Sequence, residues 1–315
     1  MKKLMMTLSV LVMMVLAACG SSEGEAGASS GDGEDKEKSK ETVTVEHELG
    51  TTEVEKNPEN VVVFDFGALD TLDALGIEAD GTAKSSTLPD YLSKYEKDDY
   101  ENVGSLIEPD FEKVNSMDPD LIVISGRQAD AYEDLSDIAP TVYVETDNEN
   151  YMESFEKKTK TLAKIFGKTE EAEKKIAALK EDVEKMKEDM PEDKTGLVTL
   201  ATGGKVSAYG PGSRFGLVHD VFGVPEADKE IEASTHGMSI SFEYITEQDP
   251  DYLFIIDRDK VVKGEGQAKE LYDNDLVNQT DAKKIYLDPA VWYLSGGGLR
   301  SFEKMAEEVS AGISE

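Results

Sequence analysis

Residues 111–127 read FEKVNSMDPDLIVISGR, and residues 242–258 read FEYITEQDPDYLFIIDR. The two stretches align without a gap, since 242 − 111 and 258 − 127 both equal 131. They share the opening Phe-Glu, the Asp-Pro-Asp triplet and the closing arginine. Solenoid repeats recur about every 20–50 residues, so this longer spacing predicts two similar lobes, each contributing the same element to one shared site.

Each copy combines a short amphipathic helix with a buried strand. The Asp-Pro pair ends the helix, because a residue before proline is pushed out of the α conformation. The apolar runs 121–124 and 252–256 fit strands buried on both faces of a parallel sheet. Strands alternate with helices along the rest of the chain, which predicts an α/β fold of two Rossmann-like lobes.

Arg127 and Arg258 end the two copies, one or two residues past the strands, at the sheet edge where open α/β proteins bind ligands. The 33 basic residues include only four arginines. Arg214 lies in a glycine-rich loop that leads into a helix predicted over 214–222. The planar guanidinium suits anionic oxygens, so these three arginines predict an anion site, and surface ion pairs are the alternative. Arg300 lies near the start of the last helix, and for this arginine we expect a surface position instead of a place in the anion site.

The N-terminus has the features of an export signal. Met1-Lys2-Lys3 precedes an apolar run and then Leu16-Ala17-Ala18-Cys19, a pattern typical of a secretory signal. The last four residues resemble a lipobox, which implies removal of residues 1–18 and acylation of Cys19. An ordinary signal peptide with a coincidental cysteine is the alternative. Cys19 is the only cysteine, which excludes internal disulfides and thiolate metal sites.

The rest of the chain divides into a tether, two lobes and a connection. Residues 19–41 are acidic and poor in large apolar side chains, which predicts a disordered tether. Residues 42–150, opening with a β-hairpin, form the N-terminal lobe, and residues 191–315 form the C-terminal lobe. Residues 151–190 have helical spacing with a break at Gly167, which predicts connecting helices. The part from Glu170 to Met190 would be the single long helix, about 30 Å in length, that joins the lobes. A plain surface helix is the alternative.

The composition excludes several classes of function. A formal net charge of −34 excludes a general nucleic-acid binder. The same field repels anions, so the arginines would have to create a local positive region. No stretch beyond the signal is long and apolar enough to cross a membrane. We therefore expect an extracytoplasmic monomer, lipid-anchored to the outer face of the cell membrane.

Five further phrases carry a family resemblance. The arrangement of two lobes, connecting helix and lipobox resembles the helical-backbone class (class III) of ABC-transporter solute-binding proteins. The chain from about residue 42 onward is similar to Gram-positive petrobactin-type, catecholate siderophore-binding lipoproteins. The phrases that carry this closer resemblance are VVFDFG at 62–67, DYLSKY at 90–95, VGSL at 103–106, STHG at 234–237 and WYLSGGG at 292–298.

The resemblance implies a ligand and a set of contacts. The ligand is an Fe³⁺–siderophore complex captured between the lobes for iron uptake, with no intrinsic cofactor. The family's ligand arginines correspond to Arg127, Arg214 and Arg258. Its other pocket positions correspond to His236 and Tyr293, which would coordinate metal only through a siderophore-bound Fe³⁺. A backbone-bonded loop histidine and a pocket-wall aromatic are the respective alternatives.

Two more aromatic residues and two glutamates complete the candidate site. Tyr209 and Trp292 would stack on catechol rings or merely pack. The resemblance also implies that one surface glutamate per lobe docks on the ABC permease, which points to Glu112 and Glu243, the glutamates shared by the repeat. A helix-dipole role is the alternative for these two.

Other functions remain as alternatives. A receptor for another iron chelate, haem, or bare zinc or manganese fits the same fold, although a metal site needs converging His and carboxylate ligands. Only His219 and His236 lie beyond the first hairpin. An exported hydrolase would need a motif such as Gly-X-Ser-X-Gly or His-Glu-X-X-His, and neither occurs. We therefore expect a binding protein and no enzyme.

Overall fold

The computed structural model describes residues 41–84 and 87–314. The predicted signal peptide, the lipidation residue Cys19 and residues 19–40 of the predicted tether lie outside these ranges. None of the helices in the described ranges combines the length and the apolar character needed to cross a bilayer.

The N-terminal lobe is a parallel sheet with a hairpin beside it. Its strands follow the order β5-β4-β3-β6-β7, and every neighbouring pair is parallel. The hairpin β1–β2 pairs antiparallel, as the sequence predicts. The strands are β1 (Thr42–His47), β2 (Gly50–Glu55), β3 (Val61–Val63), β4 (Gly81–Thr82), β5 (Glu101–Asn102), β6 (Leu121–Ile124) and β7 (Thr141–Tyr143). The helices are α1 (Phe66–Ala74), η1 (Asp90–Glu96), α2 (Phe111–Met117), η2 (Gly126–Ala131) and α3 (Tyr132–Ser136).

The C-terminal lobe has a corresponding sheet with the order β10-β9-β8-β11-β12. Strands β8, β11 and β12 are parallel, whereas β9 runs antiparallel to both β8 and β10. The strands are β8 (Gly196–Thr202), β9 (Lys205–Tyr209), β10 (Met238–Ile240), β11 (Tyr252–Asp257) and β12 (Lys283–Leu287). The helices are α6 (Leu217–Asp220), α7 (Phe242–Gln248), α8 (Arg258–Val262), α9 (Ala268–Leu271) and η3 (Val277–Gln279).

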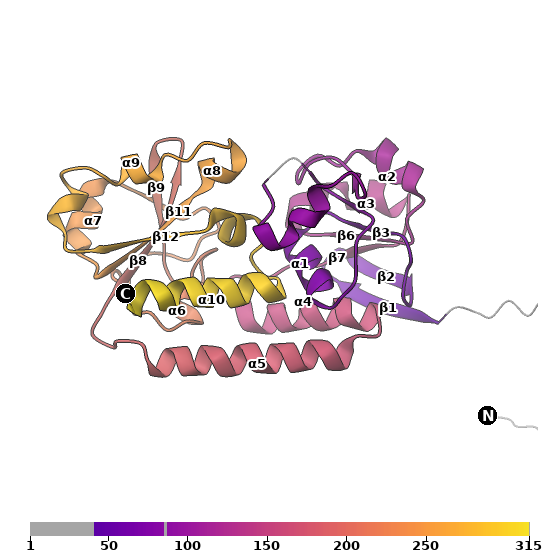
Figure 1. The fold of residues 1–315 in the computed structure, drawn as a ribbon, viewed down its shortest axis with the longest axis horizontal. Helices are drawn as coiled ribbons and strands as arrows, with labels where there is room; N and C mark the ends of the chain where they lie inside the picture. The colour runs from indigo at the N-terminus through magenta and orange to yellow at the C-terminus, as the bar shows by residue number, and fades with distance from the viewer. Residues whose placement is uncertain (1–40, 85–86, 315) are drawn as a thin grey trace, which may run out of the picture. The chain divides into compact units, whose positions relative to one another are not determined.

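The predicted long helix joins the lobes. Helix α4 (Tyr151–Ile165) is followed at Gly167, which has a φ of 63°, by α5 (Thr169–Glu188). The chain returns through the π-helix η4 (Ala290–Leu294) and α10 (Leu299–Ser314). Figure 1 shows α5 running beneath α4 and α10. The connection is therefore a layer of three helices: α4 and α5 lie in the predicted connecting segment 151–190, and α10 is the final helix of the chain.

The Asp-Pro-Asp triplet has the same structural role in both lobes. Helices α2 and α7 each end at an aspartate in the left-handed conformation, Asp118 with φ 50° and Asp249 with φ 43°. Two residues later, Asp120 accepts backbone N–H groups just before β3, and Asp251 accepts one just before β8, each at 2.9 Å. Both carboxylates thereby fix the start of the neighbouring strand.

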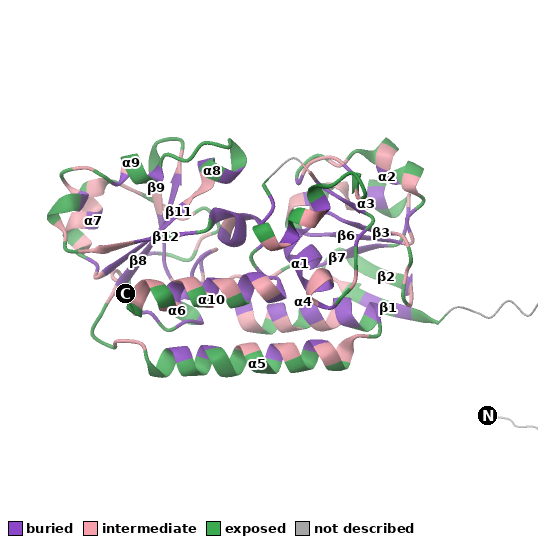
Figure 2. Ribbon diagram, in the orientation of Figure 1, coloured by how far each residue is buried: buried purple, intermediate pink, exposed green. Residues whose placement is uncertain are grey.

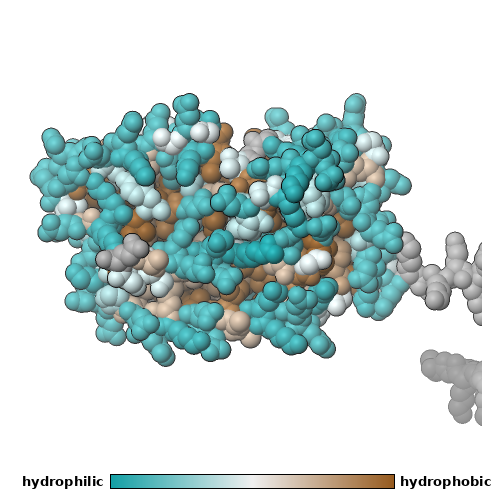
Figure 3. Space-filling model, in the orientation of Figure 1, coloured by the Kyte–Doolittle hydropathy of each residue, from teal (hydrophilic) through white to brown (hydrophobic). Residues whose placement is uncertain are grey.

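The cores explain how the lobes and the helical layer hold together. One apolar cluster fills the N-terminal lobe, and another lies on one face of the C-terminal sheet. A third joins the opposite face of that sheet to α4, α5 and α10, where the ring of Phe302 stacks on Phe155 at 5.1 Å. Figure 2 shows burial concentrated in the strands, with α5 exposed along its outer side. Hydrophilic residues dominate the face seen in Figure 3, in keeping with the high charge.

One sequence expectation is shortened by the structure. The segment 214–222 is helical only at α6, from Leu217 to Asp220. The preceding residues form tight turns instead, since Ser213 N–H bonds the Gly210 carbonyl and Gly216 N–H bonds the Ser213 carbonyl. This leaves Arg214 on a turn beside the interlobe space.

Candidate functional site

A cavity of about 470 Å³ lies between the two lobes. The N-terminal lobe contributes Ser125 and Arg127 at the carboxyl end of β6, and the C-terminal lobe contributes Arg214 and His236. The π-helix η4 supplies Trp292 and Tyr293 between them. The cavity therefore lies at the sheet edge that the repeat predicts.

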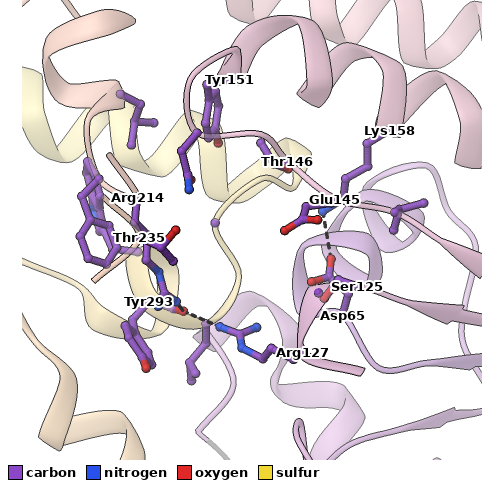
Figure 4. A pocket seen from close by; sticks show the side chains of 18 of the residues that line it. Asp65, Ser125, Arg127, Glu145, Thr146, Tyr151, Lys158, Arg214, Thr235 and Tyr293 are labelled. Carbon is purple, nitrogen blue, oxygen red and sulfur yellow. Dashed lines mark hydrogen bonds and ion pairs between the residues drawn. The ribbon is translucent and has the colours of Figure 1, made fainter. Parts of the chain in front are cut away.

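Tyr293 is the point on which the three predicted arginines converge. Its carbonyl oxygen accepts one hydrogen bond from Arg127 and one from Arg214, each at 2.9 Å. Its hydroxyl oxygen accepts a third from Nε of Arg258 at 2.7 Å. Figure 4 shows Arg127 approaching from the side of Ser125 and Asp65, and Arg214 lying on the other side.

The position of Tyr293 in the chain explains why its carbonyl is free for the arginines. The last carbonyls of a helix lack partners within the helix, and η4 ends at the following residue. The guanidinium carbon of Arg214 also lies 4.2 Å from the centre of the Tyr293 ring, and that of Arg258 lies 5.3 Å away. Cations over an aromatic face are attracted by the ring. Arg258 contacts Tyr293 in this way but is not among the residues that line the cavity.

The arginines also change the acidity of Tyr293. Burial acts to raise the pKa of its hydroxyl, but the hydrogen bond from Arg258 and the charges of Arg214 and Arg258 outweigh burial. The pKa of Tyr293 therefore lies below the ordinary value of a tyrosine. A lowered pKa favours the phenolate, an anionic oxygen ligand.

The remaining predicted aromatics have different positions. Trp292 is buried, lines the cavity, and donates its indole N–H to Glu308 at 2.9 Å. Tyr209 lies behind the cavity wall: its hydroxyl donates to the His236 carbonyl at 3.0 Å, and its ring packs edge-on against Phe215. Burial raises the pKa of Tyr209 to about 12. Tyr209 thus supports the loop that carries the exposed His236, and stacking by Tyr209 on a ligand stays a prediction.

Three charged residues of the cavity were not singled out from the sequence. Lys158 of α4, almost fully buried, lies 2.9 Å from Oδ1 of Asp65, and the same oxygen accepts the Ala68 N–H that begins α1. Glu145 accepts a hydrogen bond from the Tyr143 hydroxyl. Burial acts to raise the pKa of Asp65, yet Lys158 and the charge of Arg127 bring it below its ordinary value. The site is therefore of mixed charge on its N-terminal side, as Figure 4 shows.

Sequence signals for these residues differ in strength. Asp65 lies within the phrase VVFDFG and directly follows the apolar run of strand β3. The sequence therefore contains a signal that places Asp65 at the sheet edge. Lys158 was hidden in a helix rich in lysine and glutamate. Its partner is 93 residues away, and no local pattern reports that contact.

Glu112 and Glu243 occupy equivalent positions outside the cavity. Both are exposed in the first turn of their helices, α2 and α7. These helices lie in different lobes (Figure 1). Hydrogen bonds from its own backbone N–H and from the Ser241 hydroxyl lower the pKa of Glu243. The two glutamates are thus displayed in the same way on each lobe.

The described ranges contain no cluster of side chains suited to hold a bare metal ion. Among residues 41–84 and 87–314, no three side chains of His, Cys, Asp or Glu converge. His219 is buried, and its Nδ1 lies 2.8 Å from the Val224 carbonyl. His47 lies in the first hairpin, next to Thr52.

Comparisons with known proteins agree with this geometry. Residues 61–291 match the family model described as periplasmic binding protein. The petrobactin-binding protein YclQ of Bacillus subtilis is 50% identical over 86% of this chain and 88% of its own length. Its crystal structure has a TM-score of 0.85 at 49% identity and covers 88% of this chain and 100% of that chain. The periplasmic catecholate-siderophore binding protein VctP of Vibrio cholerae has a TM-score of 0.81 at 39% identity, with 86% of this chain and 100% of that chain covered. The resemblance and the fold class inferred from the sequence are thereby confirmed.

Proposed function

This chain belongs to the periplasmic binding protein family, and we propose that it captures a ferric catecholate siderophore of the petrobactin type between its lobes, as the substrate-binding lipoprotein of an ABC importer. The observation that carries the proposal is the convergence of Arg127, Arg214 and Arg258 on one residue beside an interlobe cavity. Such a protein binds and delivers its ligand and performs no chemistry on it. Its place is outside the cytoplasm, held by a lipid on Cys19, and it acts as a monomer.

Charge supports an anionic ligand despite the acidity of the chain. On the C-terminal side no carboxylate among the described residues lines the cavity, where Arg214 is found, and Arg258 lies 5.3 Å from the centre of the Tyr293 ring. On the N-terminal side the two carboxylates Asp65 and Glu145 are matched in number by the cations Lys158 and Arg127. A ferric tris-catecholate is triply negative, and each charge-assisted hydrogen bond to it stabilises the complex by about 1.5–3 kcal/mol. Screening within about 10 Å keeps the distant surface charge from cancelling this effect.

Tyr293 and His236 are suited to complete the coordination of iron. Ferric iron favours anionic oxygen and also accepts imidazole, and the lowered pKa of Tyr293 supports the first role. His236 is exposed at the cavity. When a siderophore supplies fewer than six donor atoms, these two side chains would occupy the vacant positions on its iron. With a hexadentate siderophore they would contact the ligand only.

Delivery to the permease would use the two repeated glutamates. Glu112 and Glu243 lie at matching positions of α2 and α7, one on each lobe. Exposed ion pairs are individually weak, so the two glutamates would add little affinity for the permease. They would instead fix the orientation of the protein, because two contacts at a set separation allow only one. The experiment that checks this role is uptake of iron by cells that carry both glutamates changed to alanine, with ligand binding measured on the purified protein as the control.

The central test is a titration followed by the fluorescence of Trp292, the only tryptophan in the chain. Ferric complexes of petrobactin and of simpler catecholates are added in parallel with a ferric hydroxamate, haem, Zn²⁺ and Mn²⁺. We expect saturable quenching by the ferric catecholates at the lowest concentrations. Tighter binding of haem, a hydroxamate or a bare cation would replace the proposal with the corresponding receptor.

A further inference from the structure

Helix α1 of the N-terminal lobe holds the first turn of α10 through a buried carboxylate. Asp70 has no solvent exposure. Its Oδ1 accepts the backbone N–H of Arg300 at 3.2 Å, and its Oδ2 accepts that of Ser301 at 2.7 Å. These are N–H groups that a helix start leaves without partners, and the helix dipole favours a negative charge there. An N-terminal helix residue thus caps a helix that follows it by 230 residues.

The contact is tight and is reinforced around its edge. A side chain at Gly298 would collide with the carboxylate of Asp70, so the approach requires glycine there. Arg300 forms an ion pair with Asp73, one turn further along α1. The Tyr91 hydroxyl lies 3.2 Å from Oγ of Ser295. Arg300, for which a surface role was the plain expectation, is therefore part of a contact between distant parts of the chain.

The segment held in this way leads directly to the cleft. Ser301 donates its hydroxyl to the Ser295 carbonyl at 2.7 Å, which closes the turn between η4 and α10. Glu308 of α10 accepts both the indole N–H of Trp292 and the backbone N–H of Asp288, at 2.9 and 3.0 Å. Both ends of η4 are therefore tied to α10. The residue between these ties, Tyr293, carries the carbonyl that Arg127 and Arg214 share.

We propose that Asp70 is a positioning residue for ligand binding: by fixing the start of α10 it places Tyr293, and through Tyr293 the two arginines of opposite lobes. Asp70 does not line the cavity and acts only through this chain of contacts. The expected effect of Asp70 on ligand affinity rests on the proposed function. Its effect on the position of η4 does not, because the fluorescence of Trp292 reports that position without any ligand.

A merely structural helix cap would give a different result, and the chain contains a matched control. Asp120 also accepts two backbone N–H groups, those of Glu59 and Asn60, each at 2.9 Å. It lies at the amino end of β6, whereas the cavity residues Ser125 and Arg127 follow the carboxyl end. Asp70→Ala and Asp120→Ala therefore remove the same kind of contact at different distances from the cleft. Asp70→Asn keeps the shape and one acceptor oxygen, for the case that Asp70→Ala does not fold.

The measurements are the dissociation constant for ferric petrobactin, the emission maximum and acrylamide quenching of Trp292 in the free protein, and the melting temperature. For Asp70→Ala we expect affinity to fall about five- to tenfold, and Trp292 to become more accessible to acrylamide. For Asp70→Asn, both the affinity and the accessibility of Trp292 should be intermediate between those of Asp70→Ala and of the wild type. Asp120→Ala should have a lower melting temperature than the wild type, while its affinity and its Trp292 signal stay unchanged.

Each outcome decides one question. If the wild type does not bind ferric petrobactin, the proposed function fails, and the Trp292 signal of the Asp70 variants still decides the positioning role. If Asp70→Asn, or a folded Asp70→Ala, keeps both the wild-type affinity and the wild-type Trp292 signal, the inference is overturned. It is equally overturned if Asp70 and Asp120 variants lose affinity in proportion to their loss of stability.

Discussion

The two sheets place corresponding strands in corresponding positions, β5-β4-β3-β6-β7 in one lobe and β10-β9-β8-β11-β12 in the other, yet their cleft walls differ in charge. The N-terminal wall combines Arg127 with Asp65, Glu145 and Lys158. The C-terminal wall has Arg214 and, within the part of the chain that the structure describes, no lining carboxylate. The shared strand order positions one arginine at each edge, and the loops around it decide whether its charge is balanced. The unbalanced positive charge of the lining therefore lies in the C-terminal lobe, since the two cations and two carboxylates of the N-terminal wall balance in number.

The strongest test of this difference is Lys158→Met. This change leaves Asp65 buried as an uncompensated charge beside the N-terminal wall. Breaking a buried ion pair on one side typically costs about 3–5 kcal/mol, so we expect a loss of that size in the free energy of unfolding, measured by urea denaturation at neutral pH. The double variant Lys158→Met/Asp65→Asn is the control and should recover part of the loss. An unchanged stability of the single variant would show that Asp65 is not held charged by Lys158.

A smaller effect separates the two arginines that share the Tyr293 carbonyl. Arg214→Ala removes a hydrogen bond and the contact with the Tyr293 ring, where no carboxylate offsets its charge. We expect it to weaken ferric petrobactin binding by about 2–3 kcal/mol. Arg127→Ala should cost about 1.4 kcal/mol, or tenfold, because Asp65 already offsets part of its charge. Calorimetric titration of both variants checks the order, and a larger loss for Arg127→Ala would reverse the assignment of roles to the lobes.

A third test concerns pH and the two buried carboxylates Asp65 and Asp70 of the N-terminal lobe. Burial raises the pKa of Asp70 to about 6, while backbone N–H bonds to Ser301 and Arg300 only partly oppose this. In the unfolded chain an aspartate titrates near pH 3.9. The folded state thus holds a proton that the unfolded state has lost, so the contribution of Asp70 to stability is present below about pH 4 and is lost as pH rises toward 6. Asp65, with its lowered pKa, contributes in the opposite direction, since its contribution is lost as pH falls.

Urea denaturation between pH 4 and 7 measures this prediction. Relative to the wild type, Asp70→Asn should show a stability that falls less, or rises more, between pH 4 and 6, because it lacks the group that titrates. Parallel pH profiles for the two proteins would mean that Asp70 does not titrate in this interval.

Much of the fold was contained in the repeated phrase. Its two copies predict α2 with β6 and α7 with β11, and they place Arg127 and Arg258 at equivalent sheet edges, as the structure shows. Arg214 was selected by its residue type and its glycine-rich loop, and Tyr293 by the family resemblance. These predictions were possible because helix stops, buried strands and guanidinium chemistry are local properties of the sequence.

The rest depends on contacts that no local pattern carries. The acceptor at the centre of the site is the backbone carbonyl of Tyr293, which every residue possesses and no motif distinguishes. Lys158 and Asp65 meet across 93 residues, and Asp70 reaches α10 across 230. Strand β10 is only three residues long and lies at a sheet edge, with no buried residue to mark it.

The shared carbonyl of Tyr293 has a consequence for the energetics of ligand uptake. A carbonyl oxygen has two lone pairs, and two guanidinium groups already donate hydrogen bonds to this oxygen in the free protein. Both side chains are partly buried, so each cation has already lost part of its water when the chain folds. An anion that takes these donors has to displace the carbonyl oxygen as well as water, so the enthalpy of association includes the loss of two hydrogen bonds within the protein.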